Sequence, residues 1–171
     1  MKKITLVVLL LITGLSIFAK QSKHKKQKQQ GNEFMSLALH HTGCYGRCPT
    51  YIIEINRNGI ATYTGIRFTP DSGIYTKKIG VTNAMEIINL ANEYRIDTCK
   101  DRYENRVQDL PGINYTINFD NKTKPILNAN YGPYFLAILK VKMDSVLDQK
   151  ADESGLLPLD KSWHKATGGR K

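Results

Sequence analysis

Cys44 and Cys48 are the residues whose type and spacing most directly indicate a chemistry. They stand in the segment CYGRCP, with three residues between the thiols and Gly46 at the middle. A glycine at this point permits the tight reversal that would bring the two Cβ atoms close enough for a disulfide. The pair therefore predicts a disulfide that closes a short loop.

Two other chemistries fit the same cysteines. One is a catalytic dithiol, although oxidoreductase motifs commonly have two residues between the cysteines. The other is a zinc site with His41, Cys44 and Cys48 as ligands. His40 would point to the opposite face of a strand from His41, so at most one of the two joins easily. The third cysteine, Cys99, is either a free thiol or an alternative partner for one of the pair.

Acidic residues crowd the segment between residues 95 and 111. Paired carboxylates can act as general acid and base in a hydrolase, or can hold Ca²⁺. The spacing matches no calcium loop. The favoured interpretation is a local one, in which Asp109 caps the turn before Leu110 and Pro111. The carboxylates of the segment are Asp97, Asp101, Glu104 and Asp109.

The sequence does not contain an assembled catalytic set. It lacks a serine nucleophile elbow, a phosphate-binding loop and an HExxH zinc motif. We therefore interpret the chain as a non-catalytic binding module, with no cofactor and with an envelope protein or polymer as partner. The alternative is an enzyme, either a thiol–disulfide protein using the two cysteines or a hydrolase using the loop carboxylates. The candidate binding residues are Tyr45, Arg47, Asp101, Tyr103 and Asp109.

Hydrophobic periodicity predicts the elements that must position these residues. Apolar stretches, most of them alternating with polar residues, predict strands over residues 34–41, 51–55, 60–68, 74–79, 113–119 and 125–129. Apolar residues at steps of three and four predict one helix over 84–94 and another that opens at Gly132 and Pro133. For the first helix, Asn83 with Glu86 resembles a capping box, and Thr82 is a rival cap.

This order of elements predicts the fold class. Hairpin-length connections make the sheet mainly antiparallel. Two amphipathic helices must then cover one of its faces. We expect a two-layer α+β domain with about five to six strands and both helices packed on one face of the sheet.

The start of the chain predicts an export signal. Two lysines precede an apolar stretch from Ile4 to Ala19, which is short for a membrane span and is followed by a polar tract. We expect cleavage near Ala19, with an uncleaved anchor as the alternative, and a periplasmic or secreted mature protein without a transmembrane span. The expected organisation is a signal peptide (1–19), a basic linker (20–33), one domain (34–150) and a C-terminal tail (151–171).

The charge distribution argues against a nucleic-acid partner. The chain of 171 residues carries a net charge of +10, but residues 31–150 hold 14 basic and 12 acidic side chains. Five lysines without an acidic residue lie in residues 20–30. The excess charge therefore belongs to a low-complexity tract, Lys20 to Lys28, that we expect to act as a solvated linker, with weak contact to anionic surfaces as its functional alternative.

Two blocks of the sequence resemble a bacterial family known as domain of unknown function 6438. The first is HTGCYGRCPTYIIEINRNGIATYTG, and the second joins Asp101-Arg102-Tyr103 to Val107-Gln108-Asp109-Leu110-Pro111. With the closing helix at Gly132-Pro133, the resemblance spans residues 36–148. It implies an exported or envelope-associated protein and implies no activity. The resemblance places Cys44, Cys48, Tyr103, Asp109 and Pro111 among the signature positions of the family, and leaves Cys99 outside them.

Overall fold

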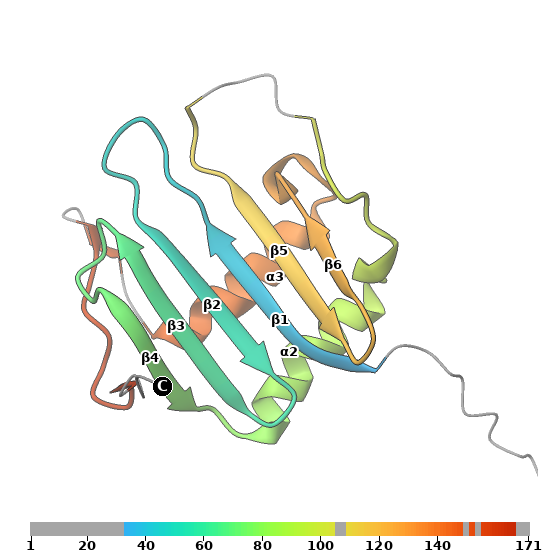
Figure 1. Cartoon of the computed structure of the whole chain (residues 1–171), viewed down its shortest axis with the longest axis horizontal. Coiled ribbons are helices and arrows are strands. Elements are labelled where there is room, and N and C mark those ends of the chain that lie inside the picture. Colours follow the sequence, from blue (N-terminus) through green and yellow to red (C-terminus); the bar gives the residue numbers. More distant parts are fainter. Residues whose placement is uncertain (1–32, 105–108, 149–150, 153–154, 167–171) are drawn as a thin grey trace, which may run out of the picture. The chain divides into compact units, whose positions relative to one another are not determined.

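The structure is a computed structural model. It describes four stretches of the chain, residues 33–104, 109–148, 151–152 and 155–166 (Figure 1). The expected signal peptide and nearly all of the expected linker lie outside these residues. Among the described residues, no helix combines the length and the apolar character needed to cross a membrane.

The core of the fold is one antiparallel sheet with seven strands in the order β6-β5-β1-β2-β3-β4-β9. The chain builds β1 to β4 as a meander outward from the centre, then crosses the sheet through a helix and adds β5 on the free side of β1. The strands are β1 (Phe34–His41), β2 (Thr50–Asn56), β3 (Ile60–Arg67), β4 (Gly73–Lys78), β5 (Ile113–Phe119), β6 (Thr123–Ile126) and β9 (His164–Lys165).

Two helices cover one face of this sheet, α2 (Val81–Glu93) and α3 (Phe135–Asp144), and Figure 1 shows both behind the strands. Strand residues alternate between this covered face and the open face, which carries Ser36, Glu54, Thr62 and Thr116. Removal of the covered-face side chains from water supplies the main driving force for folding. The largest fully buried side chains of the sheet include Leu37, Leu39, Ile53, Ile55, Tyr63, Tyr115 and Ile117, and those of the helices include Ile87, Ile88 and Leu136.

Short elements account for the remaining regular structure of the described residues. Three 3₁₀ turns lie at η1 (Ile96–Thr98), η2 (Ala129–Tyr131) and η3 (Ser145–Leu147), the last of which continues α3. A separate two-stranded ladder joins β7 (Ala151–Asp152) to β8 (Gly155–Leu156).

The predicted α+β class, the mainly antiparallel sheet and the two helices on one face are confirmed. The sheet has one strand more than the upper expectation, because the segment after residue 150 contributes β9. This strand pairs with β4 at Tyr75 and Thr76. It follows Trp163, which is buried against Tyr63 with 6.2 Å between ring centroids. The sheet therefore includes residues beyond the expected domain limit of 150.

The predicted cap of the first helix is wrong. The helix begins at Val81 after Gly80, and no side chain caps it. Asn83 lies inside the first turn, where its side-chain amide donates to the carbonyl of Ile79 at 2.8 Å. Gly80, with a φ of 84°, lets the chain turn directly from β4 into the helix, so neither Thr82 nor Asn83 is needed as a boundary.

Candidate functional site

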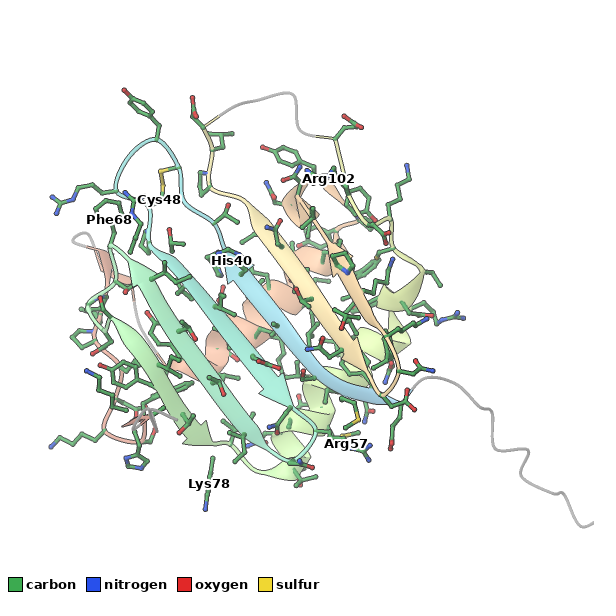
Figure 2. All side chains as sticks on the ribbon, viewed as in Figure 1. His40, Cys48, Arg57, Phe68, Lys78 and Arg102 are labelled. Atoms are coloured by element: carbon green, nitrogen blue, oxygen red, sulfur yellow. A yellow bond between two sulfur atoms is a disulfide. The ribbon has the colours of Figure 1, made fainter. Side chains whose placement is uncertain are left out.

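The loop over residues 42–49, here called the Cys loop, joins β1 to β2 at one end of the sheet. The sulfur atoms of Cys44 and Cys48 lie at disulfide-bonding distance and the two Cα atoms are 5.6 Å apart. Figure 2 shows the bond in this loop. At its base, the backbone N–H of Thr42 donates to the carbonyl of Gly112 at 2.9 Å, and the Gly112 N–H donates to Thr42 Oγ1 at 2.8 Å. The loop is thus closed covalently and tied to the segment that leads into β5.

Three of the five predicted binding residues meet at the Cys loop. Tyr45 stands at its tip with 91% of its surface exposed, and Arg47 is exposed two residues later. The backbone N–H of Tyr45 donates to the carbonyl of Asp109 at 3.4 Å. Asp109 itself has a φ of 64°, a left-handed conformation that aspartate tolerates better than most residues. Residues 64 positions apart in the sequence therefore share one surface.

The other two predicted binding residues lie elsewhere, beside the outer strand β6. The backbone of residues 101–103 runs along Leu127, with hydrogen bonds of 2.8 and 3.0 Å. Asp101 accepts a hydrogen bond from Lys124 at 2.5 Å, and the half-buried Tyr103 packs its ring against Gly132. Figure 2 shows the neighbouring Arg102 far from Cys48 across the sheet. The structure therefore separates Asp101 and Tyr103 from the Cys loop.

The hydrolase alternative depends on where the carboxylates of the 95–111 segment lie. Asp97 pairs with Arg95 at 3.3 Å, Asp101 with Lys124, and Asp109 lies exposed beside the Cys loop. A glycoside hydrolase requires two carboxyl groups that face each other across a substrate. Asp97, Asp101 and Asp109 are held in three different environments, each beside different neighbours.

A cluster that the sequence did not indicate lies under the Cys loop, on the covered face of the sheet. His41 ends β1, and its Nε2 lies 2.9 Å from Oδ1 of Asp144 on α3. The hydroxyl of Tyr51, on β2, donates to the same oxygen at 3.3 Å, and its ring stacks on His41 with 4.2 Å between centroids. Lys140 donates to Oδ2 of Asp144 at 2.7 Å. These four residues are here called the Asp144 cluster.

The electrostatics of the Asp144 cluster favour an ionised carboxylate. Burial alone would raise the pKa of Asp144, but hydrogen bonds and positive charge from His41 and Lys140 outweigh burial and lower that pKa. Burial, followed by the charge of Asp144, raises the pKa of Tyr51, which therefore stays a neutral donor. Both carboxylate oxygens accept hydrogen bonds, so the carboxylate is satisfied within the cluster.

The contacts of the Asp144 cluster join one helix to two strands. In a catalytic triad, the histidine of a histidine–aspartate pair also contacts a nucleophilic side chain. Among the residues that the structure describes, His41 has no hydrogen bond to a serine, threonine or cysteine side chain. The cluster instead fastens α3 to the ends of β1 and β2, directly below the Cys loop. The only signal of it in the sequence is the spacing of Lys140 and Asp144, four residues apart on one helix.

The zinc alternative assigns His41 and the two cysteines to a metal. In the structure His41 faces Asp144, and the sulfurs of Cys44 and Cys48 are bonded to each other. The described residues contain no group of three histidine, cysteine or acidic side chains placed to hold a metal ion. The adjacent His40 points to the open face of the sheet, as strand alternation requires.

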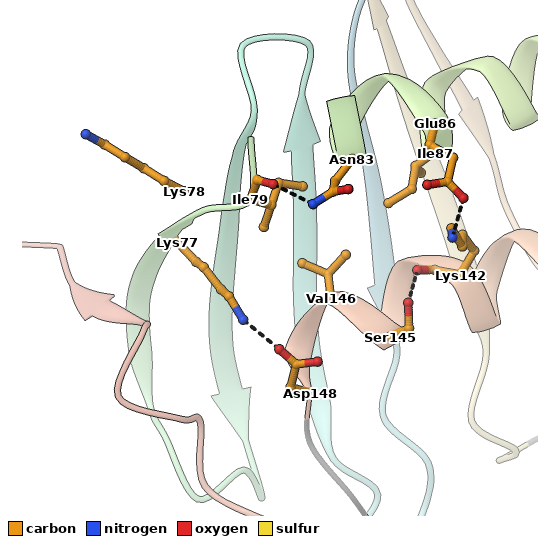
Figure 3. A pocket seen from close by; sticks show the side chains of 10 residues that line it. All are labelled: Lys77, Lys78, Ile79, Asn83, Glu86, Ile87, Lys142, Ser145, Val146 and Asp148. Carbon is orange, nitrogen blue, oxygen red and sulfur yellow. Dashed lines mark hydrogen bonds and ion pairs between the residues drawn. The ribbon is translucent and has the colours of Figure 1, made fainter. Parts of the chain in front are cut away.

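A pocket of about 410 Å³ lies at the other end of the sheet, between β4, α2 and the end of α3 (Figure 3). Its charged side chains are largely paired. Lys77 contacts Asp148 at 2.7 Å, and Lys142 contacts Glu86 at 2.6 Å. These pairs leave little free charge for a ligand, so the pocket is a weaker candidate than the Cys loop.

Comparison with known proteins identifies the family of the chain. No curated protein and no solved structure matches it. A family described as a domain of unknown function matches residues 35–147, which include β1 except its first residue, β2 to β6, both helices and the Cys loop. This match covers well over half of the chain, and the chain therefore belongs to the domain of unknown function family DUF6438.

Proposed function

We propose that this protein is a non-catalytic binding module of the bacterial cell envelope that contacts its partner through the Cys loop. The observation that carries the proposal is the exposure of Tyr45, a large aromatic side chain at 91%, on a loop closed by a disulfide. An exposed aromatic residue offers much contact area with few rotatable bonds. A loop that is already ordered loses less conformational entropy when it binds.

The Asp144 cluster supports this role from below. It joins the strand ends that carry the Cys loop to α3, and it holds them by three hydrogen bonds to one carboxylate. The backbone pairing of Thr42 with Gly112 fixes the loop from the side. A surface supported in this way keeps its shape without a partner, as a preformed binding site requires.

We also propose export to an oxidising compartment. The support is the charged, apolar and then polar pattern of the first residues, together with two cysteines placed for a disulfide. In the cytoplasm, thiol reductants would keep this pair reduced.

Intact mass of protein isolated from its source organism tests export and the disulfide together. We expect a mass without residues 1–19 and, under denaturing conditions, one alkylated thiol before reduction and three after. The single early thiol is Cys99, which is half-buried and whose pKa burial raises, so denaturation is needed to expose it. Three alkylated thiols before reduction would refute the disulfide, and a full-length mass would refute cleavage.

Site-specific photo-crosslinking tests the binding role. We expect a photoreactive phenylalanine analogue in place of Tyr45 to give a discrete crosslinked product in living cells of the source organism. The matched control is the same analogue in place of Tyr134, a tyrosine that is 81% exposed at the start of α3 on the helix layer. Crosslinking from position 45 and not from 134 supports the proposal. No product from position 45, or equal products from both positions, contradicts it.

A further inference from the structure

An exposed aromatic ring with two arginines beside it lies next to the Cys loop. The guanidinium carbons of Arg47, on the Cys loop, and Arg67, at the end of β3, lie 5.8 and 4.9 Å from the ring centroid of Phe68. Figure 2 shows Phe68 and Cys48 at the same end of the sheet. These three residues are here called the Arg–Phe–Arg cluster, and they join the Cys loop to the loop between β3 and β4.

The backbone of Phe68 is unfavourable for its residue type. Its φ is 53°, in the left-handed region, where the Cβ atom of a bulky residue crowds the backbone and where glycine or asparagine is favoured. Such strain persists where the surroundings enforce it, and it concentrates at functional sites. Burial does not account for the residue here, because 44% of Phe68 is exposed. An aromatic ring held in this way at the surface is a candidate contact for another molecule.

The two arginines keep hydrogen-bonding capacity that no other described residue uses. Within the described parts of the chain, neither Arg47 nor Arg67 forms an ion pair, whereas Arg57 at the other end of the sheet pairs with Glu33. A guanidinium group presents a planar fork of N–H donors that matches a carboxylate. Contact with the Phe68 ring restrains both groups before a ligand arrives.

From this geometry we propose that the Arg–Phe–Arg cluster binds an acidic peptide segment of a partner protein, an inference that rests on the proposed function and names the chemistry of the partner. Carboxylates of the segment accept hydrogen bonds from Arg47 and Arg67, and an apolar neighbour packs on Phe68. Two more exposed apolar side chains lie nearby in the sequence: Tyr45, two residues before Arg47, and Ile66, two residues before Phe68. Aromatic and arginine side chains with apolar area typify protein interfaces, whereas a lipid headgroup or an acidic polysaccharide offers charge without apolar side chains.

Fluorescence anisotropy with a labelled peptide of alternating glutamate and leucine tests the proposal on the mature chain. We expect the wild-type protein to bind this probe, and the double variant R47A/R67A to bind it at least tenfold more weakly, because each arginine contributes a charge-assisted hydrogen bond. The control, R102A, removes one positive charge at the β6 side of the sheet, against two in R47A/R67A, and should change the affinity less than twofold. No binding by the wild type, or equal losses in R102A and R47A/R67A, would overturn the proposal.

Two further variants separate specific binding from general charge and from misfolding. R47K/R67K keeps the charge but loses the planar forks, and we expect it to bind the probe several-fold more weakly than the wild type. F68N suits the left-handed backbone, so it should remain folded while the affinity for the probe falls. Full affinity for the probe in either variant would contradict the binding role proposed for the Arg–Phe–Arg cluster.

The source of the negative charge and the link to the proposed function are tested in parallel. The second probe is phosphatidylglycerol vesicles. Any binding of the protein to these vesicles should be the same in the wild type and in R47A/R67A. Vesicle binding that is lost in R47A/R67A would assign the cluster to lipid instead. A crosslink from position 45 without peptide binding would support the proposed function and refute the proposal that the partner segment is acidic. Peptide binding at the cluster without a crosslink would support the acidic ligand and refute the proposal that the tip of the Cys loop contacts the partner in cells.

Discussion

Replacing Gly59 by alanine is expected to destabilise the domain by about 4 kcal/mol, the largest effect of any substitution considered for this protein. Gly59 closes the hairpin between β2 and β3 with a φ of 81°, a conformation that alanine adopts only with strain. A Cβ atom there would lie 2.5 Å from the carbonyl carbon of Gly80 and 2.6 Å from the nitrogen of Val81. Those atoms are backbone and cannot rotate away, so the start of α2 must move.

The reason for this close approach is a pair of hydrogen bonds. The carbonyl of Gly59 accepts from the N–H groups of Ile79 and Gly80, at 2.9 and 3.2 Å. The hairpin turn thereby holds the chain where it passes from β4 into α2. A substitution that moves the two segments apart breaks these bonds as well as straining the turn.

Urea denaturation measures the effect, with Gly73→Ala as the matched control. Gly73 also has a positive φ, of 107°, but a Cβ atom there would meet only the flexible end of Lys165, at 3.8 Å. Alanine at position 73 should therefore cost only the backbone strain, about 2 kcal/mol. Equal losses in the two variants would show that the contact with the start of α2 is unimportant.

Replacing Asp144 by asparagine is expected to cost about 2–3 kcal/mol at neutral pH. The carboxylate accepts hydrogen bonds from His41, Tyr51 and Lys140, and asparagine offers one acceptor oxygen in place of two and no charge. The loss should appear as a lower urea midpoint with an unchanged slope. Because the cluster supports the base of the Cys loop, the affinity for the acidic peptide should also fall.

The stability difference between the wild type and D144N should depend on pH, because the pKa of Asp144 is lowered in the folded state. A carboxyl group with a lower pKa in the folded than in the unfolded state stabilises the fold above its unfolded pKa, which is about 4. That contribution is lost as the pH falls through the folded value. We therefore expect the difference in stability between wild type and D144N to be largest above about pH 5 and to shrink below pH 4.

The control for D144N is Asp101→Asn. Asp101 also pairs with a lysine, Lys124, but its own side chain is 73% exposed. An exposed ion pair contributes about 0–1 kcal/mol, so D101N should have little effect on the urea midpoint. A loss in D101N as large as in D144N, or a pH-independent loss in D144N, would refute the role assigned to the cluster.

The strands and helices were largely predictable because their signals are local. Alternation of apolar residues over 60–68 and 113–119 corresponds to β3 and β5, and steps of three and four residues correspond to α2 and α3. Such periods record which side of each element is buried, and the core confirms them at Ile87, Ile88, Leu136 and Leu139. The start of α2 was missed because Gly80 ends the strand by its backbone conformation, a signal weaker in sequence than a polar cap.

The candidate surface was predictable only in part. Tyr45 and Arg47 belong to one short loop and had to lie together. Asp109 joins them because the segment before β5 pairs with the Cys loop, and Asp101, from the same stretch of sequence as Asp109, is carried to β6 by its pairing with Leu127. Sequence proximity therefore grouped the two acidic residues, and strand pairing separated them.

The sequence by itself determined the fold class, the positions of the elements and the short loop between two cysteines, because each depends on residues within a few positions of one another. Only the tertiary structure decided that His41 meets Asp144, 103 residues away, and that Arg47 and Arg67 share the ring of Phe68. These contacts depend on strand order, on register and on the placement of α3 across the sheet. Packing of the whole core sets those three properties at once, and no local pattern in the chain encodes them.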